Sequence, residues 1–442
     1  MDSQQFRDIF NNLSPRLKQV FRLFLQRKTD PEMATSLYVS EATVRKHIEN
    51  LTIKFKLKEE FDDSRKSRRA DLMGLAVEHM PELVNSELIA TSETQPSTIS
   101  ATPQPTSPQC EDWGNAPDAE PFYGRIKELE TLEQWMLQDC CRLIAIVGMG
   151  GIGKTALSVK VVEQVNSQFE CFIWRSLRDA PPLADLLADL IRFVSQQPEM
   201  DLPESERDRL SQLMELLRQR RCLLVLDGFE AVLQEGDPTG DSQVGYEGYG
   251  ELLKRIADER HQSCLLLNSR EKPQALMWRE GKNKPVRSIR LESLGDDARS
   301  ILEEFELTDE KKWSALINHY NGNPLGLRMV CAHIQEVCNG SVSQFIDLGT
   351  TVLGPEFQKI LYQQFDRLSE LEKRILCSLA INSKTASLEH LRDELQIESN
   401  SELIQALHQL SWRSLLEKVP EGNTTLFSIP PVVKKFVNKY VL

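Results

Sequence analysis

Residues 143–157, LIAIVGMGGIGKTAL, constrain the fold more than any other stretch of this 442-residue chain. The apolar run 143–147 predicts a buried strand, and the pattern that resumes after Thr155 predicts a helix. Between them lies the spacing G-x-x-x-x-G-K-T, from Gly148 to Thr155. Glycines let the backbone curl so that successive N–H groups face phosphate oxygens, which predicts a phosphate-binding loop. A glycine-rich surface turn is the alternative, and the flanking strand and helix disfavour it.

Two further apolar runs end in polar side chains. Residues 222–226 lead to Asp227, and residues 263–267 lead to Asn268, Ser269 and Arg270. Alternating strands and helices predict a doubly wound parallel sheet, whose carboxyl ends meet at one edge. Lys154 is then expected to reach the β- and γ-phosphates of ATP, or the β-phosphate of ADP. Thr155 is expected to ligate Mg²⁺, and Asp227 to hold the same ion through water.

The first 70 residues differ from the rest in charge, with 15 Lys and Arg against 10 Asp and Glu in a chain of net charge −13. Pro15 follows Ser14 at the start of a predicted helix. A second helix, capped by Ser40, carries Thr43, Arg45 and Lys46 opposite its apolar face. Two short helices of this kind predict a helix-turn-helix. The predicted buried residues are Leu17, Val20, Phe21, Phe24, Leu25, Val44, Ile48 and Leu51.

This segment resembles the LuxR-type helix-turn-helix in its L-S-P-R opening, its S-E-A-T-V-R-K-H centre and its K-F-K-L close. The resemblance implies that Thr43, Arg45 and Lys46 face DNA and that Lys54 lies near phosphates. Glu49 departs from the pattern, since many relatives carry a basic residue there and a carboxylate repels phosphate. The alternative is that the same fold docks a protein partner.

The chain is expected to contain several domains, and composition and periodicity indicate where each one begins and ends. Residues 92–108 are rich in Pro, Ser and Thr without periodicity, which is typical of a disordered linker. Beyond residue 291 the pattern is helical, and helices at 370–380, 387–395 and 402–410 precede a β-hairpin, which predicts a winged helix. The predicted domains are a helix-turn-helix at 1–84, a linker at 85–119, a nucleotide-binding domain at 120–288, a helical domain at 289–366 and a winged helix at 367–442.

Together the motifs resemble the NB-ARC class of STAND NTPases, and cyanobacterial members in particular. Besides the phosphate loop and Asp227, they are Tyr-Gly-Arg at 123–125, Asn-Ser-Arg at 268–270 and Gly-Asn-Pro-Leu-Gly-Leu at 322–327. The resemblance implies that Tyr123 and Arg125 contact the adenine side, Arg270 senses the γ-phosphate and Pro324 packs on the base or ribose. The loop residues expected to bind nucleotide are Gly148, Met149, Gly150, Gly151, Ile152, Gly153, Lys154, Thr155 and Ala156.

Two positions depart from that class. Gly228 follows Asp227 where an acid or Asn is common, and Glu230 stands two residues further on. Glu230 either polarises a water, joining Lys154, Asp227 and Arg270 as a catalytic residue, or is a solvated helix residue. Pro430 stands where the class has a His that touches the ADP β-phosphate, and it cannot donate a hydrogen bond.

Bulk properties narrow the setting. The nine cysteines make no metal-ligand spacing, which favours reduced thiols. No apolar run approaches the ~20 residues of a membrane span, and the start has no signal-peptide core. The sequence therefore predicts a cytoplasmic protein.

The leading hypothesis is a regulator switched by ATP and ADP. Nucleotide state would control domain arrangement and homo-oligomerisation, and thereby an N-terminal module that binds DNA or docks a protein. A slow, Mg²⁺-dependent ATP hydrolysis would reset it, and a separate protein could act as sensor. The alternative is an interaction scaffold with a permanently bound structural ADP. A DNA-dependent motor is disfavoured because no helicase-like motifs accompany the loop.

Overall fold

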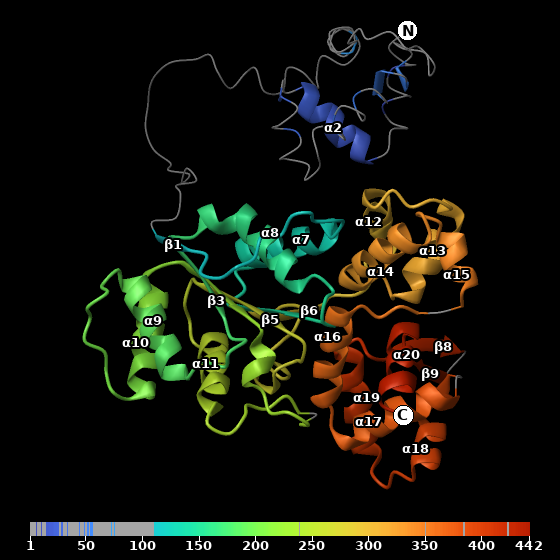
Figure 1. Cartoon of the computed structure of the whole chain (residues 1–442). Helices are drawn as coiled ribbons and strands as arrows, with labels where there is room; N and C mark the ends of the chain where they lie inside the picture. Colours follow the sequence, from blue (N-terminus) through green and yellow to red (C-terminus); the bar gives the residue numbers. More distant parts are fainter. Residues whose placement is uncertain are drawn as a thin grey trace. The chain divides into compact units, whose positions relative to one another are not determined.

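The computed structural model describes the chain as two compact units, Met1–Thr102 and Pro103–Leu442 (Figure 1). In the first unit it describes residues 6, 10, 15–25, 28, 29, 33, 44, 48, 51, 52, 54, 55, 72 and 75. In the second it describes residues 110–442 except 238, 350, 383, 384, 422 and 423. The predicted linker residues before 110 lie outside the described residues.

The first unit is built around helix α2 (Pro15–Leu25). Its apolar face is buried as predicted, and Phe21 stacks on Phe55 with a centroid separation of 5.3 Å. Phe6 also stacks on Phe55, at 4.6 Å, and its ring lies 6.4 Å from that of Phe21. Aromatic contacts of this kind give a small helical unit a single packed core. The predicted residues Leu17, Val20, Phe21, Phe24, Leu25, Val44, Ile48 and Leu51 all belong to that core.

The second unit contains a six-stranded sheet in which every pairing is parallel. The strand order is β1-β3-β4-β5-β2-β6, so the strand before the phosphate loop, β2, lies between β5 and β6. This order confirms the predicted parallel α/β sheet. The strands are β1 (Cys110–Asp112), β2 (Leu143–Val147), β3 (Cys171–Ser176), β4 (Cys222–Asp227), β5 (Cys264–Ser269) and β6 (Val286–Arg290).

Both faces of the sheet are covered (Figure 1). Ile144 and Ile146 of β2 join one core, which includes Leu157 of α8. Their neighbours in the strand face the opposite core, which includes Leu187 of α9. Continuous apolar strands are therefore required, as in other parallel sheets. The covering helices are α7 (Ile126–Glu133) and α8 (Lys154–Val165) on one face, and α9 (Leu183–Ser195), α10 (Glu206–Gln219) and α11 (Glu247–Asp258) on the other.

The structure corrects the sequence prediction at the start of this unit. Residues 110–112, predicted to belong to the linker, form the edge strand β1 beside β3. Cys110 lies opposite Cys171 in that pairing, and their Sγ atoms form a disulfide. The expectation that all cysteines are reduced is therefore wrong for this pair. Sequence spacing gave no signal, because the two thiols meet only through strand register.

The C-terminal half is helical, with one small sheet. Helices α12 (Arg299–Glu304), α13 (Glu310–His319), α14 (Pro324–Val337) and α15 (Val342–Asp347) form one group. The second group contains α16 (Pro355–Asp366), α17 (Glu370–Asn382), α18 (Leu388–Leu395), α19 (Asn400–Trp412) and α20 (Pro431–Tyr440). A three-stranded antiparallel sheet, in the order β7-β9-β8, belongs to the second group. Its strands are β7 (Ala386–Ser387), β8 (Glu417–Glu421) and β9 (Thr424–Ser428).

Helix α16 lies in the segment that the sequence assigns to the helical domain, 289–366. In the structure it also packs on α20: Tyr362 and Phe365 both contact the ring of Phe436, with centroids 4.9 and 6.1 Å away, while Phe357 at its other end lies against Gly326 of α14. The C-terminal group of helices therefore begins at α16, before residue 367. Short helical turns complete the unit: η2 (Gln134–Gln138), η3 (Asn166–Gln168), η4 (Phe229–Val232), η5 (Gln274–Leu276) and η6 (Gly295–Ala298).

Candidate functional site

The predicted phosphate loop joins β2 to α8. Gly151 and Gly153 have φ angles of 76° and 100°, which L side chains rarely adopt. At Gly153 a Cβ would meet no atom within 4 Å, so open space adjoins the loop. The loop therefore combines left-handed glycines with room beside the N-terminus of α8, an arrangement that suits an anion.

Lys154 is the cation of this loop. Its Nζ donates hydrogen bonds to the carbonyls of Gly148 and Met149 at 2.8 and 3.0 Å. Desolvation lowers the pKa of Lys154 to about 8, although Glu230 and Asp227 act to raise it. The carbonyl oxygens hold this desolvated ammonium, and no described residue forms an ion pair with it. A phosphate group at this position would supply a negative charge.

Asp227 ends β4 and is 4% exposed. Parallel register places Asp227 opposite Asn268 of β5. The Oδ1 atom of Asp227 accepts hydrogen bonds from Thr155 Oγ1 and from Asn268 Nδ2, each at 2.9 Å. Its Oδ2 forms a 3.0 Å ion pair with Arg178, whose side chain is 67% exposed. The neighbouring oxygens of Thr155 and Asp227 fit a hard divalent cation such as Mg²⁺.

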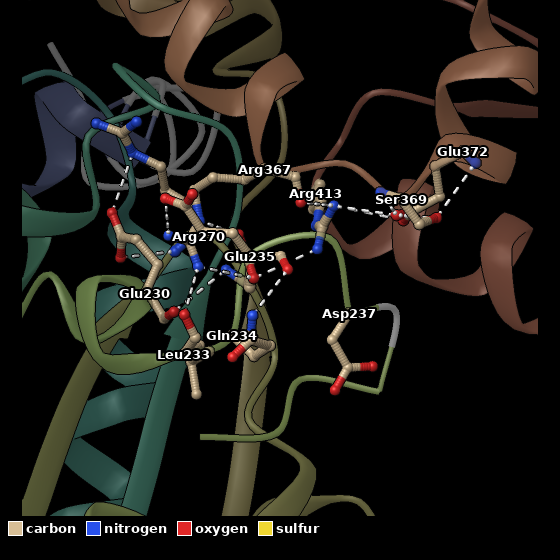
Figure 2. Close-up of polar contacts among 12 residues, drawn as sticks. Glu230, Leu233, Gln234, Glu235, Asp237, Arg270, Arg367, Ser369, Glu372 and Arg413 are labelled. Atoms are coloured by element: carbon tan, nitrogen blue, oxygen red, sulfur yellow. Dashed lines mark hydrogen bonds and ion pairs between the residues drawn. The ribbon is translucent and has the colours of Figure 1, made fainter. Parts of the chain in front are cut away.

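Arg270 leaves the end of β5 and faces Glu230 (Figure 2). Its Nε lies 3.1 Å from Glu230 Oε1, and its backbone N–H donates to Glu230 Oε2 at 3.1 Å. The guanidinium also donates to Gln363 Oε1 of α16 at 3.2 Å. Both carboxylate oxygens of Glu230 thus hold Arg270, which makes Glu230 a positioning partner of that arginine in this arrangement.

The start of α14 touches the phosphate loop. Asn323 caps the helix by accepting a hydrogen bond from the Gly326 N–H, and its Nδ2 donates to the Gly150 carbonyl at 3.0 Å. Pro324 occupies the first helical turn, where its missing N–H costs nothing. The backbone N–H of Leu325 donates to Gly151 O at 3.3 Å. The structure therefore brings Pro324 next to the loop, and its contact with the base or ribose stays a prediction.

Tyr123 and Arg125 take different positions. Arg125 is 5% exposed and donates to the Ile152 carbonyl of the loop at 3.3 Å and to the Glu292 carbonyl at 2.6 Å. The hydroxyl of Tyr123 donates to Glu304 on α12 and lies 3.4 Å from Arg328 Nη1. Of this predicted pair, Arg125 is therefore the one that contacts the loop. Ala156, also predicted to bind nucleotide, is half-buried in the first turn of α8.

Sequence reasoning missed a buried ionic network next to Arg270 (Figure 2). Glu271 pairs with Arg367 at 2.6 Å and with Arg413 at 3.3 Å, and Arg413 also pairs with Glu372 at 3.4 Å. Glu271, Arg413 and Glu372 have side chains at most 3% exposed. Burial raises the pKa of Glu372, which Arg413 and Ser369 act to lower. The network joins the end of β5 to the C-terminal helices.

One local signal pointed toward this network. Ser369 and Glu372 have the S-x-x-E spacing of a capping box. Ser369 Oγ accepts from the Glu372 N–H at 3.3 Å, and Glu372 Oε2 accepts from the Ser369 N–H at 2.8 Å. The spacing identifies the start of α17, but not the arginine that shares the carboxylate.

The predicted DNA contacts are only partly described. Lys54 is exposed on the first unit. Thr43, Arg45 and Lys46 lie outside the described residues. Within the described parts of both units, no helix has the length and apolar character to cross a membrane. The same residues contain no group of three or more His, Cys, Asp or Glu side chains that could hold a metal ion by themselves.

Two family models match this chain. Residues 125–235 match the NB-ARC domain, and residues 11–62 match the bacterial regulatory proteins of the luxR family. The first match covers the phosphate loop and Asp227. The second covers α2 and the predicted recognition helix.

Individual proteins are similar to parts of this chain. An uncharacterised WD repeat-containing protein of Nostoc sp. is 42% identical over 346 residues, covering 75% of this chain and 27% of that protein. The chain thus spans about a quarter of that relative. The spore germination protein GerE of Bacillus subtilis is 46% identical over 46 residues, covering 10% of this chain and 62% of GerE. A STAND protein with a tetratricopeptide repeat sensor from Pyrococcus horikoshii aligns over 74% of this chain and 44% of its own, with 18% identity and a TM-score of 0.38.

The parallel sheet, the loop and Asp227 define a P-loop NTPase domain. In this chain it is an NB-ARC domain, and it is joined to an N-terminal LuxR-type helix-turn-helix.

Proposed function

We propose that this chain is a nucleotide-switched regulator. ATP and ADP bind at the phosphate loop and favour different arrangements of the nucleotide-binding part and the C-terminal helices. The arrangement controls self-association and thereby how tightly the N-terminal module binds DNA. The proposed domains are those predicted from the sequence, with β1 moved from the linker into the nucleotide-binding domain and α16 moved into the C-terminal one. That domain, with its three-stranded sheet, is proposed to be a winged helix.

The observation that carries this proposal is the loop after β5. Arg270 lies at the phosphate loop and contacts α16 through Gln363. The next residue, Glu271, pairs with Arg413 at the end of α19. Lys272 follows, with its Nζ 4.0 Å from the ring centroid of Trp412. Three consecutive side chains thus connect the phosphate site to the C-terminal helices, so a displacement of Arg270 alters that contact surface directly.

Each residue of the site has a role in this proposal. Lys154 and the glycine N–H groups hold the phosphates, and Arg270 binds the γ-phosphate that only ATP carries. Thr155 and Asp227 hold Mg²⁺, which would neutralise phosphate charge when bound. Arg125 stabilises the loop through its hydrogen bond to the Ile152 carbonyl, and Pro324 packs on the base or ribose. Hydrolysis is slow, because Glu230 forms an ion pair with Arg270 and is not free to polarise a water. This slow hydrolysis resets the switch.

The N-terminal module is the output. Its helix-turn-helix is proposed to contact DNA through Thr43, Arg45, Lys46 and Lys54. A single copy with few basic side chains binds weakly and with strong salt dependence. Self-association raises the effective affinity by placing two modules on neighbouring half-sites. The proposal implies a cytoplasmic protein that meets both nucleotide and DNA.

The decisive experiment measures nucleotide exchange together with assembly. Purified chain is loaded with ADP or ATP, the bound nucleotide is identified by mass, and sedimentation velocity reports the oligomer. We expect exchange on both nucleotides, a larger species with ATP, and loss of binding in Lys154→Ala. If ADP never exchanges and sedimentation is the same with ATP, the switch is refuted and the scaffold with a structural ADP takes its place.

A further inference from the structure

A buried glutamine of α16 faces the phosphate loop. Gln364 is 3% exposed, and its Oε1 accepts a hydrogen bond from the Gly150 N–H at 3.4 Å. Its Nε2 is also buried and has no hydrogen-bond partner among the described residues. A buried amide donor without an acceptor is unfavourable, so the nitrogen is suited to an acceptor that enters the site from outside.

The orientation of this amide follows from its neighbour. Gly150 offers an N–H donor, so the oxygen of Gln364 must face it and the NH₂ group must point elsewhere. The reversed amide would place two donors against each other. The 3.4 Å separation is long for a hydrogen bond, so this contact is weak and open to exchange.

Two other groups converge on the same glycine. A Cβ built on Gly150 would lie 2.3 Å from Ile360 Cγ2 of α16 and 3.6 Å from the guanidinium carbon of Arg270. Helix α16 therefore lies directly against the loop. Arg270 and Gln364 approach Gly150 together, and Gln363 links Arg270 to the same helix at 3.2 Å.

We propose that Gln364 is a nucleotide-contacting residue, whose Nε2 donates a hydrogen bond to the terminal phosphate of ATP beside Gly150. This rests on the proposed function, in which Arg270 binds that phosphate. The γ-phosphate of ATP offers an acceptor to the buried NH₂ group of Gln364. ADP has no γ-phosphate and therefore offers no acceptor at that position. Gln364 thereby lets α16, and the C-terminal helices packed on it, respond to ATP directly.

The test measures dissociation constants of the full chain for Mg-ATP and Mg-ADP by calorimetry. Gln364→Met removes the donor at nearly constant volume. We expect ATP binding to weaken roughly tenfold or more, as for a lost hydrogen bond to a charged acceptor, while ADP binding changes less than about twofold. Gln364→Glu keeps the acceptor for the Gly150 N–H and places a carboxylate toward the phosphate, so it should weaken ATP binding further.

Gln409→Leu is the matched control. Gln409 is 1% exposed on α19, and its Nε2 also has no partner among the described residues, but it makes no hydrogen bond to the loop there. Its substitution should leave both affinities unchanged, and circular dichroism verifies that each variant is folded. If Gln364→Met binds ATP like wild type, or loses ATP and ADP equally, the proposal is overturned. Absence of nucleotide binding in wild type would instead overturn the proposed function.

Discussion

Neutralising Glu271 tests whether the ionic network links the nucleotide site to the C-terminal helices. Its carboxylate is 3% exposed and pairs with Arg367 and Arg413. Burial alone would lower the pKa of Arg367, but Glu271, together with Glu235 and Glu230, raises that pKa above its ordinary value. Glu271→Gln keeps the shape and one oxygen acceptor but removes the charge that both guanidinium groups share.

The structure sets the size of the effect. Removing one partner of a buried ion pair typically costs about 3–5 kcal/mol. Here Arg413 keeps Glu372, and Arg367 keeps the exposed Glu235 at 3.0 Å, so neither cation is left alone. The loss should therefore fall to about 1.5–3 kcal/mol, the range of a hydrogen bond to a charged group. This corresponds to roughly a 10- to 150-fold larger population of molecules in which the two parts separate.

The assay is the release rate of a fluorescent ADP analogue, which requires the site to open. We expect Glu271→Gln to accelerate release about 10- to 150-fold. The matched control, Glu235→Gln, neutralises another partner of the same Arg367, but Glu235 has a side chain 67% exposed. Exposed pairs contribute only about 0–1 kcal/mol, so its release rate should change less than about fivefold. Equal release rates in the two variants would refute the argument that burial makes Glu271 the link.

Three further results are expected. Because the lowered pKa of Lys154 is about 8 and phosphate favours its charged form, nucleotide affinity measured by calorimetry should fall about tenfold per unit above pH 8. An affinity that stays constant above pH 8 would contradict this role. Asn323→Ala removes the cap of α14 and the bond to Gly150 O, so thermal unfolding should show a loss of about 1–3 kcal/mol, with Asn323→Ser recovering part of it. Phe21→Ala should destabilise the first unit by about 3–5 kcal/mol, because that ring is fully buried there. ATP affinity should stay unchanged, because the phosphate loop belongs to the other unit. A matching loss of ATP binding would show that the two units fold together.

Local pattern was sufficient for the elements that carry the loop. The apolar run of β2, the glycine spacing and the start of α8 are all contained in about fifteen residues, so the strand–loop–helix was predicted directly. The same holds for the apolar face of α2, since helical periodicity depends only on neighbouring residues. The strand end at Asp227 was also visible, because the apolar run 222–226 stops at this carboxylate.

Weaker local signals failed. Strand β1 has three residues and follows a Pro-rich stretch, so composition placed it in the linker. Strand β6, VRSIR, is half-exposed and carries two arginines, so its sequence does not predict a strand paired with β2. The pattern beyond residue 291 was recognised as helical, but the partner of α16 was not, because its packing on α20 depends on rings more than seventy residues away in the chain.

The sequence by itself determined that this chain has a phosphate loop, a parallel sheet and a helix-turn-helix core, since each follows from short-range spacing. Tertiary structure decided which charges meet. The pairing of β4 with β5 places Glu230 next to Arg270. The packing of α19 places Arg413 next to Glu271. Gln364 reached Gly150 across 214 residues. Such contacts are set by the packing of distant elements, and no local pattern encodes them.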